Sequence, residues 1–308
     1  MNLTKQRNGI LEIYRLIIIF WVLFHHEFFF FYNNGNVFSR ASLAADFFFV
    51  ISGFFLLRSM KKLKDEPLSQ GLKKLLASRT KPLLFSVCFI TAFNVICIAA
   101  FVREDILGTS FFIFRYWWYL LYMLVAAVIF YCVYKKLKTE RSFSIFLIVL
   151  TIFCAVLYYP IDQCDILMGV LTYILRAFGC MAAGMLVAYI PSLKFKKFNY
   201  NIPIAVLLFA TLFVLAYNKK NFLICILILA MFSALVYFTL NIRVGGKVYD
   251  IIGLLSTRMY LYISFISTIY VLGLTHNRVL FFIDVAAASL DLILTLYKKK
   301  CNFRKCKA

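Results

Sequence analysis

The chain contains long apolar runs that recur between short clusters of basic residues. In one of them, Ile17 to Phe24, every residue is apolar, so no face of a helix or strand would be polar. One crossing of a bilayer as an α-helix takes about 20 mostly apolar residues. A transmembrane β-barrel would instead alternate apolar and polar residues in shorter segments. The pattern therefore predicts an all-α integral membrane protein.

The number of crossings follows from the length of the apolar runs. Hydrophobic residues make up 64% of the 308 residues, against about 45–50% in soluble domains. Ten crossings would use roughly 200 residues, which accounts for the surplus. We expect one multi-pass domain over residues 1–308, because no internal repeat, low-complexity tract or long linker interrupts the series. The ten expected spans are 9–32, 46–63, 82–102, 116–134, 143–160, 166–190, 203–218, 222–240, 248–272 and 279–297.

The net charge of +21 is distributed unevenly between the two sides of these spans. With a cytoplasmic N-terminus, 25 lysines and arginines lie on the inner side and six on the outer side, while Arg15, Arg176 and Arg258 lie within spans. Cytoplasmic loops of membrane proteins carry such an excess of Lys and Arg. The bias predicts that both termini, including a basic tail at about 298–308, are cytoplasmic. We expect a multi-pass protein of the plasma membrane whose partner is the bilayer and not nucleic acid.

One inner loop has helical patterning of its own. In residues 64–81, Leu68, Leu72 and Leu75 share one helix face, and Lys73 and Lys74 lie opposite. A helix with an apolar face and a basic face favours the membrane surface. We expect this segment to lie on the inner leaflet.

The nine cysteines are odd in number and lie mostly inside apolar runs. They are interpreted as small core residues, not as a disulfide framework. Cys301 and Cys306 lack the second pair or nearby histidine that a zinc site needs. We expect no metal site.

The first span carries ionisable residues, which are unfavourable in lipid and are functional candidates for that reason. Arg15 and His26 are eleven positions apart, which places them on one helix face about 16 Å apart along the axis. Glu12, three positions before Arg15, is within reach of an ion pair, and His25 precedes His26. Each residue alone also has a structural explanation, since Arg15 can extend to the headgroups and His26 can hydrogen-bond a neighbouring helix. Their shared face favours function.

The second span begins with Asp46 and continues through Phe48, Phe49, Ser52 and Gly53. Glycine permits a neighbouring helix to approach closely, and serine can bond to its own helix backbone. No base stands at a spacing that would activate Ser52, and no Gly-x-Ser-x-Gly pattern is present. The Ser-Gly pair therefore favours packing over a nucleophile.

These two motifs together resemble a known family. Glu12-x-x-Arg15, followed after ten residues by His26, and the Phe-Phe-x-x-Ser-Gly sequence at 48–53 are similar to those of the acyltransferase-3 family of membrane O-acyltransferases. Arg7-Asn8 and the doubled histidine resemble its branch from Gram-positive surface-polysaccharide gene sets. Weaker, collinear similarity lies at 78–82, 116–120, 176–184 and 251–262.

The late part of the chain departs from the family's pattern. Many members carry a histidine shortly after the late Tyr-Leu pair, where this chain has Phe265, and its third histidine is His276. The last expected span matches no family feature. It carries Asp284 and Asp291, which are seven positions apart and share a helix face.

The resemblance implies transfer of an acyl group, usually acetyl from acetyl-CoA, to a hydroxyl of a cell-surface polysaccharide or lipid-linked sugar. The acyl-CoA would be a donor substrate, with no permanently bound cofactor. His26 would be the base and Asp46 would orient or stabilise it, while Arg15 and Arg79 would bind the CoA phosphates. Substrate-binding or supporting roles would fall to Glu12, His25, Phe48, Phe49, Ser52 and Gly53.

Two other functions stay open at this point. Intramembrane His, Arg and Asp residues also suit a transporter or flippase for an envelope glycan or its precursor, although no inverted repeat is visible. Dependence on acyl-CoA distinguishes the two, because a carrier needs no acyl donor. The third possibility is a non-catalytic assembly or sensor protein that keeps the fold without the late histidine.

Overall fold

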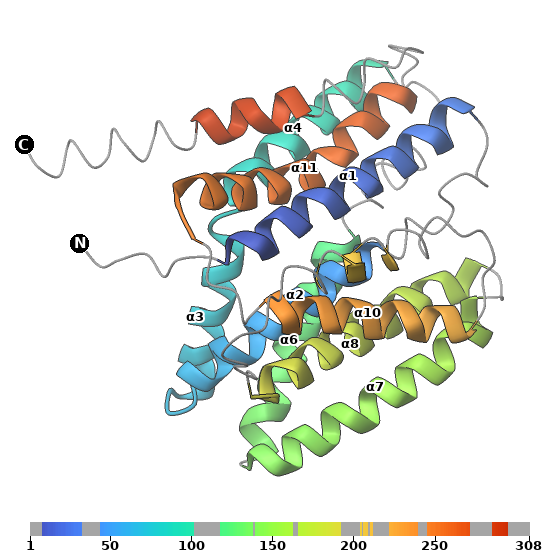
Figure 1. Cartoon of the computed structure of the whole chain (residues 1–308). Coiled ribbons are helices and arrows are strands. Elements are labelled where there is room, and N and C mark those ends of the chain that lie inside the picture. The colour runs from blue at the N-terminus through green and yellow to red at the C-terminus, as the bar shows by residue number, and fades with distance from the viewer. Residues whose placement is uncertain are drawn as a thin grey trace, which may run out of the picture. The chain divides into compact units, whose positions relative to one another are not determined.

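The computed structural model describes residues 8–32, 44–101, 118–137, 139–162, 166–191, 204, 206–208, 210–211, 222–239, 245–271 and 285–294. Nearly all of these residues are helical, and none of them is in a β-strand (Figure 1). The all-α prediction is thus confirmed over the described residues. The chain divides into two compact units: unit 1 is 1–35, 83–117 and 244–308, and unit 2 is 36–82 and 118–243.

Unit 1 is built on the contact of α1 (Gly9–Tyr32) with α11 (Lys247–Val271), and α11 also contacts α4 (Leu84–Phe101). Gly9 lies against the ring of Tyr249, and Arg15 bonds to Thr257 further along both helices. Because both residue numbers rise together, α1 and α11 run parallel. A last helix, Val285–Leu294, completes the described part of this unit.

Unit 2 is arranged around α8 (Ile166–Tyr189), which contacts α2 (Ala44–Lys62), α6 (Trp118–Leu137), α7 (Glu140–Asp162) and α10 (Phe222–Thr239). Within α8, 67% of the apolar stretch Val170–Tyr189 is buried, against 17% of Glu140–Leu157 in α7. The central helix of unit 2 is therefore α8, and α7 lies at its periphery.

Two glycines allow α2 and α8 to approach closely. A Cβ on Gly53 would overlap the backbone carbonyl oxygen of Met181, and one on Gly184 would overlap that of Val50. Helices in lipid gain little from burying apolar surface against one another, so close backbone packing at small residues is a main source of their association. Asp46 in the first turn of α2 pairs with Arg176 near the middle of α8, and Lys61 lies over the Tyr189 ring near the ends of both helices. The two helices are therefore parallel.

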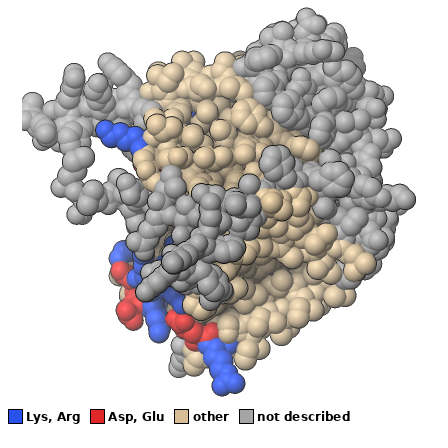
Figure 2. All heavy atoms as spheres, in the orientation of Figure 1, with Lys and Arg blue, Asp and Glu red and all other residues tan. Residues whose placement is uncertain are grey.

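The predicted amphipathic segment forms α3 (Leu68–Thr80), which packs on α6 through Gly71 against the Tyr131 hydroxyl. Lys135 Nζ donates hydrogen bonds to the carbonyl oxygens of Lys64 and Glu66, at 2.6 and 2.7 Å, and so fixes the turn before α3. Figure 2 shows charged side chains gathered at the end of unit 2 where α2, α3 and α6 meet, at the lower left. The rest of the described surface of unit 2 in this view is mainly uncharged.

The outer face of α7 is apolar, as lipid contact requires. Its exposed large side chains are Ile145, Ile148, Val149, Ile152, Phe153 and Val156. Among the described residues, three helices are long and apolar enough to cross a membrane, and a fourth is obtained if α3 and Leu84–Ile96 count as one broken span. Ten of the sixteen residues of the seventh expected span, 203–218, lie outside the described residues. Ten spans, a single domain and cytoplasmic termini therefore stay predictions.

The glycine contact predicts that Gly53→Ala destabilises the protein by about 1–3 kcal/mol or more, because the new methyl group overlaps backbone that cannot rotate away. The detergent-solubilised protein is heated to a series of temperatures, and size-exclusion chromatography measures the fraction that stays folded. The temperature at which half of the protein is lost is the midpoint. Gly246→Ala is the matched control, since its Cβ would meet Tyr249 at an ordinary 3.7 Å. Equal midpoints for the two variants would contradict the packing described.

Candidate functional site

Each of the three arginines predicted to lie within spans is paired with a carboxylate. The nitrogen–oxygen distances are 2.7 Å for Arg15–Glu12, 2.8 Å for Arg176–Asp46 and 3.2 Å for Arg258–Asp291. A charge in lipid is strongly unfavourable unless it is paired. The pairs therefore stabilise the arginines at positions that the apolar sequence would otherwise exclude.

The Arg15 guanidinium is held from two helices of unit 1. Its Nη1 donates to Glu12 Oε2 at 2.7 Å, as the spacing predicts, and its Nη2 donates to Thr257 Oγ1 at 2.6 Å. The Thr257 hydroxyl donates its own proton to the carbonyl oxygen of Gly253 at 2.9 Å, so it is oriented to accept from the arginine. Because the side chain is only 17% exposed and is bound from two helices, Arg15 is a fixed internal group of unit 1.

The start of α1 sets the position of this pair. Asn8 Oδ1 accepts from the backbone N–H groups of Ile10 and Leu11, at 3.2 and 3.4 Å, and so caps the helix. Glu12 lies in the first turn, where the helix dipole also favours a negative charge. Within the described part of the chain, the buried Arg15 Nε has no hydrogen-bond partner.

His26 and His25 lie on the same helix, and their side chains are outside the described residues. The backbone of α1 is helical without interruption from Gly9 to Tyr32. The positions of Arg15 and His26 therefore keep the helical relation that the sequence predicts, about 16 Å apart along one face.

The Phe-Phe-x-x-Ser-Gly motif of α2 forms a packing surface inside unit 2. The Ser52 hydroxyl lies 3.0 Å from the Tyr119 hydroxyl on α6. The ring centroids of Phe48 and Phe49 lie 6.1 and 4.4 Å from that of Tyr119. With Gly53 against α8, the motif joins α2 to two neighbours, in agreement with the packing interpretation of Ser52.

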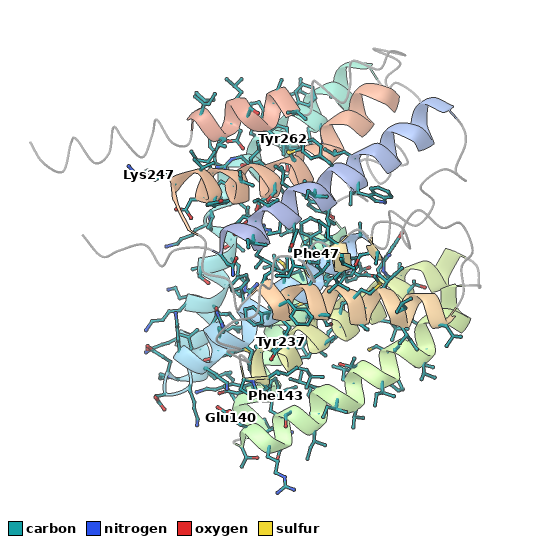
Figure 3. The ribbon with its side chains drawn as sticks, viewed as in Figure 1. Phe47, Glu140, Phe143, Tyr237, Lys247 and Tyr262 are labelled. Atoms are coloured by element: carbon teal, nitrogen blue, oxygen red, sulfur yellow. The ribbon has the colours of Figure 1, made fainter. Side chains whose placement is uncertain are left out.

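Asp46 is bound within unit 2, where its Oδ1 accepts from Arg176 Nε at 2.8 Å. The two residues line a cavity of about 40 Å³ together with Cys180 on α8 and Thr151 on α7. Such a volume holds only about one to three water molecules, so it is too small for a sugar or a pantetheine arm. Next to Asp46, Phe47 packs on Phe232 of α10 with ring centroids 5.3 Å apart (Figure 3).

Arg79 lies near the end of α3, on the stripe that Gly71 and Leu75 turn toward α6. Its guanidinium is within electrostatic range of the Tyr119 hydroxyl. Its Nε is buried and finds no hydrogen-bond partner among the residues that the structure describes. Arg79 therefore lies in the neighbourhood of the tyrosine on which the α2 motif packs.

A third buried group was not recognised in the sequence as a unit. Ser86 on α4 donates to Asp291 Oδ2 at 2.5 Å, and Arg258 Nε on α11 lies 3.2 Å from the same oxygen. Asp291 is buried, and Asp284, which shares its expected helix face, lies outside the described residues. The sequence did offer a signal for this group. Asp291 and Arg258 both lie in expected spans and have no residue of opposite charge close to them in the sequence. The same described residues contain no group of three or more side chains able to hold a metal ion.

The Asp46–Arg176 pair predicts a double-mutant result. Asp46→Asn or Arg176→Gln alone leaves one buried charge unpaired and is expected to destabilise the protein by about 3–5 kcal/mol. The double variant is expected to be more stable than either single variant, because no buried charge remains. Thermal unfolding in detergent measures this, with Lys74→Gln at the exposed Lys74–Glu66 pair as a control near zero. A double variant that loses the sum of the two single effects would contradict the pairing.

Comparison with known proteins identifies the family of the chain. A family model described as an acyltransferase domain, of the acyltransferase-3 type, matches residues 8–290, which is nearly the whole chain. Searches of curated proteins and of solved structures found no significant match. The matched region contains all three buried arginines together with Glu12, His26, Asp46 and the α2 motif. The chain therefore belongs to the acyltransferase-3 family and is a membrane acyltransferase.

Proposed function

We propose that the protein is an O-acyltransferase of the plasma membrane. It moves an acyl group, which we propose to be acetyl, from acyl-CoA to a hydroxyl of a cell-surface polysaccharide or lipid-linked sugar. One observation carries this proposal: a fixed arginine and a histidine position share one face of an unbroken apolar helix. The family membership supplies the acyl transfer, and the glycan acceptor comes from the resemblance in the α1 and α2 motifs.

In this proposal, Arg15 binds the donor. Arginine suits phosphate and carbonyl oxygens because its guanidinium presents several N–H donors in a fixed plane. The hydrogen bonds to Glu12 and Thr257 fix that plane, and Arg15 Nε is buried without a partner in the described structure. A pantetheine arm extended along α1 would span the roughly 16 Å between Arg15 and His26.

His26 acts as the general base, since an imidazole with an ordinary pKa near 6.5 is suited to proton transfer at neutral pH. The acceptor hydroxyl gives its proton to the imidazole while its oxygen attacks the thioester carbonyl. A C–O bond forms, the C–S bond breaks, and the CoA thiolate leaves and takes up the proton. Asp46 as a catalytic residue and Arg79 as a donor-binding residue are carried over from the family motifs, and their described contacts lie within unit 2.

His26→Ala is expected to abolish acetylation, because no other group in the proposal removes the proton. The measurement is base-labile acetyl on cell-envelope glycan, by NMR, in a deletion strain complemented with wild type or with the variant. His276→Ala is the matched control and is expected to restore acetyl as wild type does.

Equal restoration by wild type and His26→Ala would remove His26 from the mechanism. If the wild-type protein is present in the membrane but restores no acetyl, the proposal that the transferred group is acetyl is wrong. The same membranes then show whether a longer acyl group or transport of a glycan precursor depends on the protein.

A further inference from the structure

Two adjacent residues of α11 are held by different polar partners in unit 1. Thr257 accepts the hydrogen bond from Arg15 on α1, and Arg258 pairs with Asp291 on the helix Val285–Leu294. Successive residues of an α-helix point about 100° apart. The direction in which Arg258 is held therefore also sets the direction of Thr257.

The partner of Arg258 is the buried Asp291, which is held in turn by Ser86 of a third helix. Asp291 Oδ2 accepts from Arg258 Nε at 3.2 Å and from Ser86 Oγ of α4 at 2.5 Å. The exposed fractions of Ser86, Arg258 and Asp291 are 1%, 4% and 3%. Solvent does not compete for these bonds, so the three-helix contact resists rotation of α11 about its axis.

Rotation of α11 would act directly on Arg15. The Cα atoms of a helix lie about 2.3 Å from its axis, and a side-chain oxygen lies roughly twice as far out. A rotation of about 20° would move Thr257 Oγ1 by more than about 1 Å, which is enough to break a hydrogen bond of 2.6 Å. The guanidinium would then keep only its bond to Glu12 and could turn about it.

We propose that Asp291 is a positioning residue for donor binding, acting through Arg258 and Thr257 on the Arg15 guanidinium. This inference rests on the proposed role of Arg15 in binding acyl-CoA. The helix Val285–Leu294 thereby has a role in the reaction. Asp291 touches no substrate, but its carboxylate holds α11, and α11 orients the donor-binding Arg15. A displacement of about 1 Å at such a group reduces its contribution strongly.

The test uses the purified full-length protein in detergent and measures the binding of acetyl-CoA by isothermal titration calorimetry. Asp291→Asn and Thr257→Val are each expected to weaken binding about tenfold. The double variant is also expected to be weakened about tenfold, not a hundredfold, because Asp291 acts only through Thr257. Thr257→Ser keeps the hydroxyl and is expected to bind as wild type does.

Asp250→Asn, the same change in the first turn of α11, is the matched control and leaves the affinity unchanged. Thermal unfolding of every variant shows whether the fold is kept. If Asp291→Asn does not fold, Ser86→Ala replaces it, since it removes one of the bonds to the same carboxylate. Ser86→Ala alone is then expected to weaken binding less than tenfold. Added to Thr257→Val, it is expected to cause no further loss of affinity.

Suppose that the wild type binds acetyl-CoA and that Asp291→Asn, or Ser86→Ala in its place, binds it with the same affinity. This result would overturn the inference and leave the proposed function intact. Losses that multiply in the double variant would also overturn it, since Asp291 would then act by another route. Absence of acetyl-CoA binding by the wild type would overturn the proposed donor, and the inference with it.

Discussion

The unfavourable energy of an unpaired charge in lipid governs the polar interior of this protein. The arginines of α1, α8 and α11 each meet a carboxylate, and two of the three pairs join separate helices. The pair between Asp46 and Arg176 joins α2 to α8, and the pair between Arg258 and Asp291 joins α11 to the last described helix. Removing one partner is far more unfavourable than removing both, so these pairs also determine which helices lie together.

Apolar packing also holds the helices of unit 2 together, and much of it involves the motif of α2. The Phe-Phe-x-x-Ser-Gly sequence places two rings and a hydroxyl against Tyr119 and a glycine against the backbone of α8. Asp46, two residues before this motif, is bound by Arg176 of the same α8. The α2 motif therefore holds α2 against α6 and α8 within unit 2.

Much of the local structure could be predicted from the sequence. The expected spans 9–32, 166–190, 222–240 and 248–272 agree with α1, α8, α10 and α11 to within one residue at each end, because apolar length and charge clusters are local signals. The Glu12–Arg15 pair is also local. Two pairs could not be predicted, because their members are far apart in the sequence: Asp46–Arg176 by 130 positions and Arg258–Asp291 by 33. Periodicity shows which face of its own helix a residue occupies, but it does not show which other helix that face meets. The sequence showed only that these charges needed partners.

The central claim is that Arg15, fixed by Glu12 and Thr257, binds the acyl-CoA from which the group is transferred. The most direct measurement adds radiolabelled acetyl-CoA to the cytoplasmic side of inside-out membrane vesicles and follows label into base-labile glycan over a range of donor concentrations. Arg15→Gln is expected to raise the apparent KM for acetyl-CoA at least tenfold relative to wild type. Transfer by Arg15→Gln with the wild-type KM, or wild-type vesicles that transfer no label at all, would contradict it.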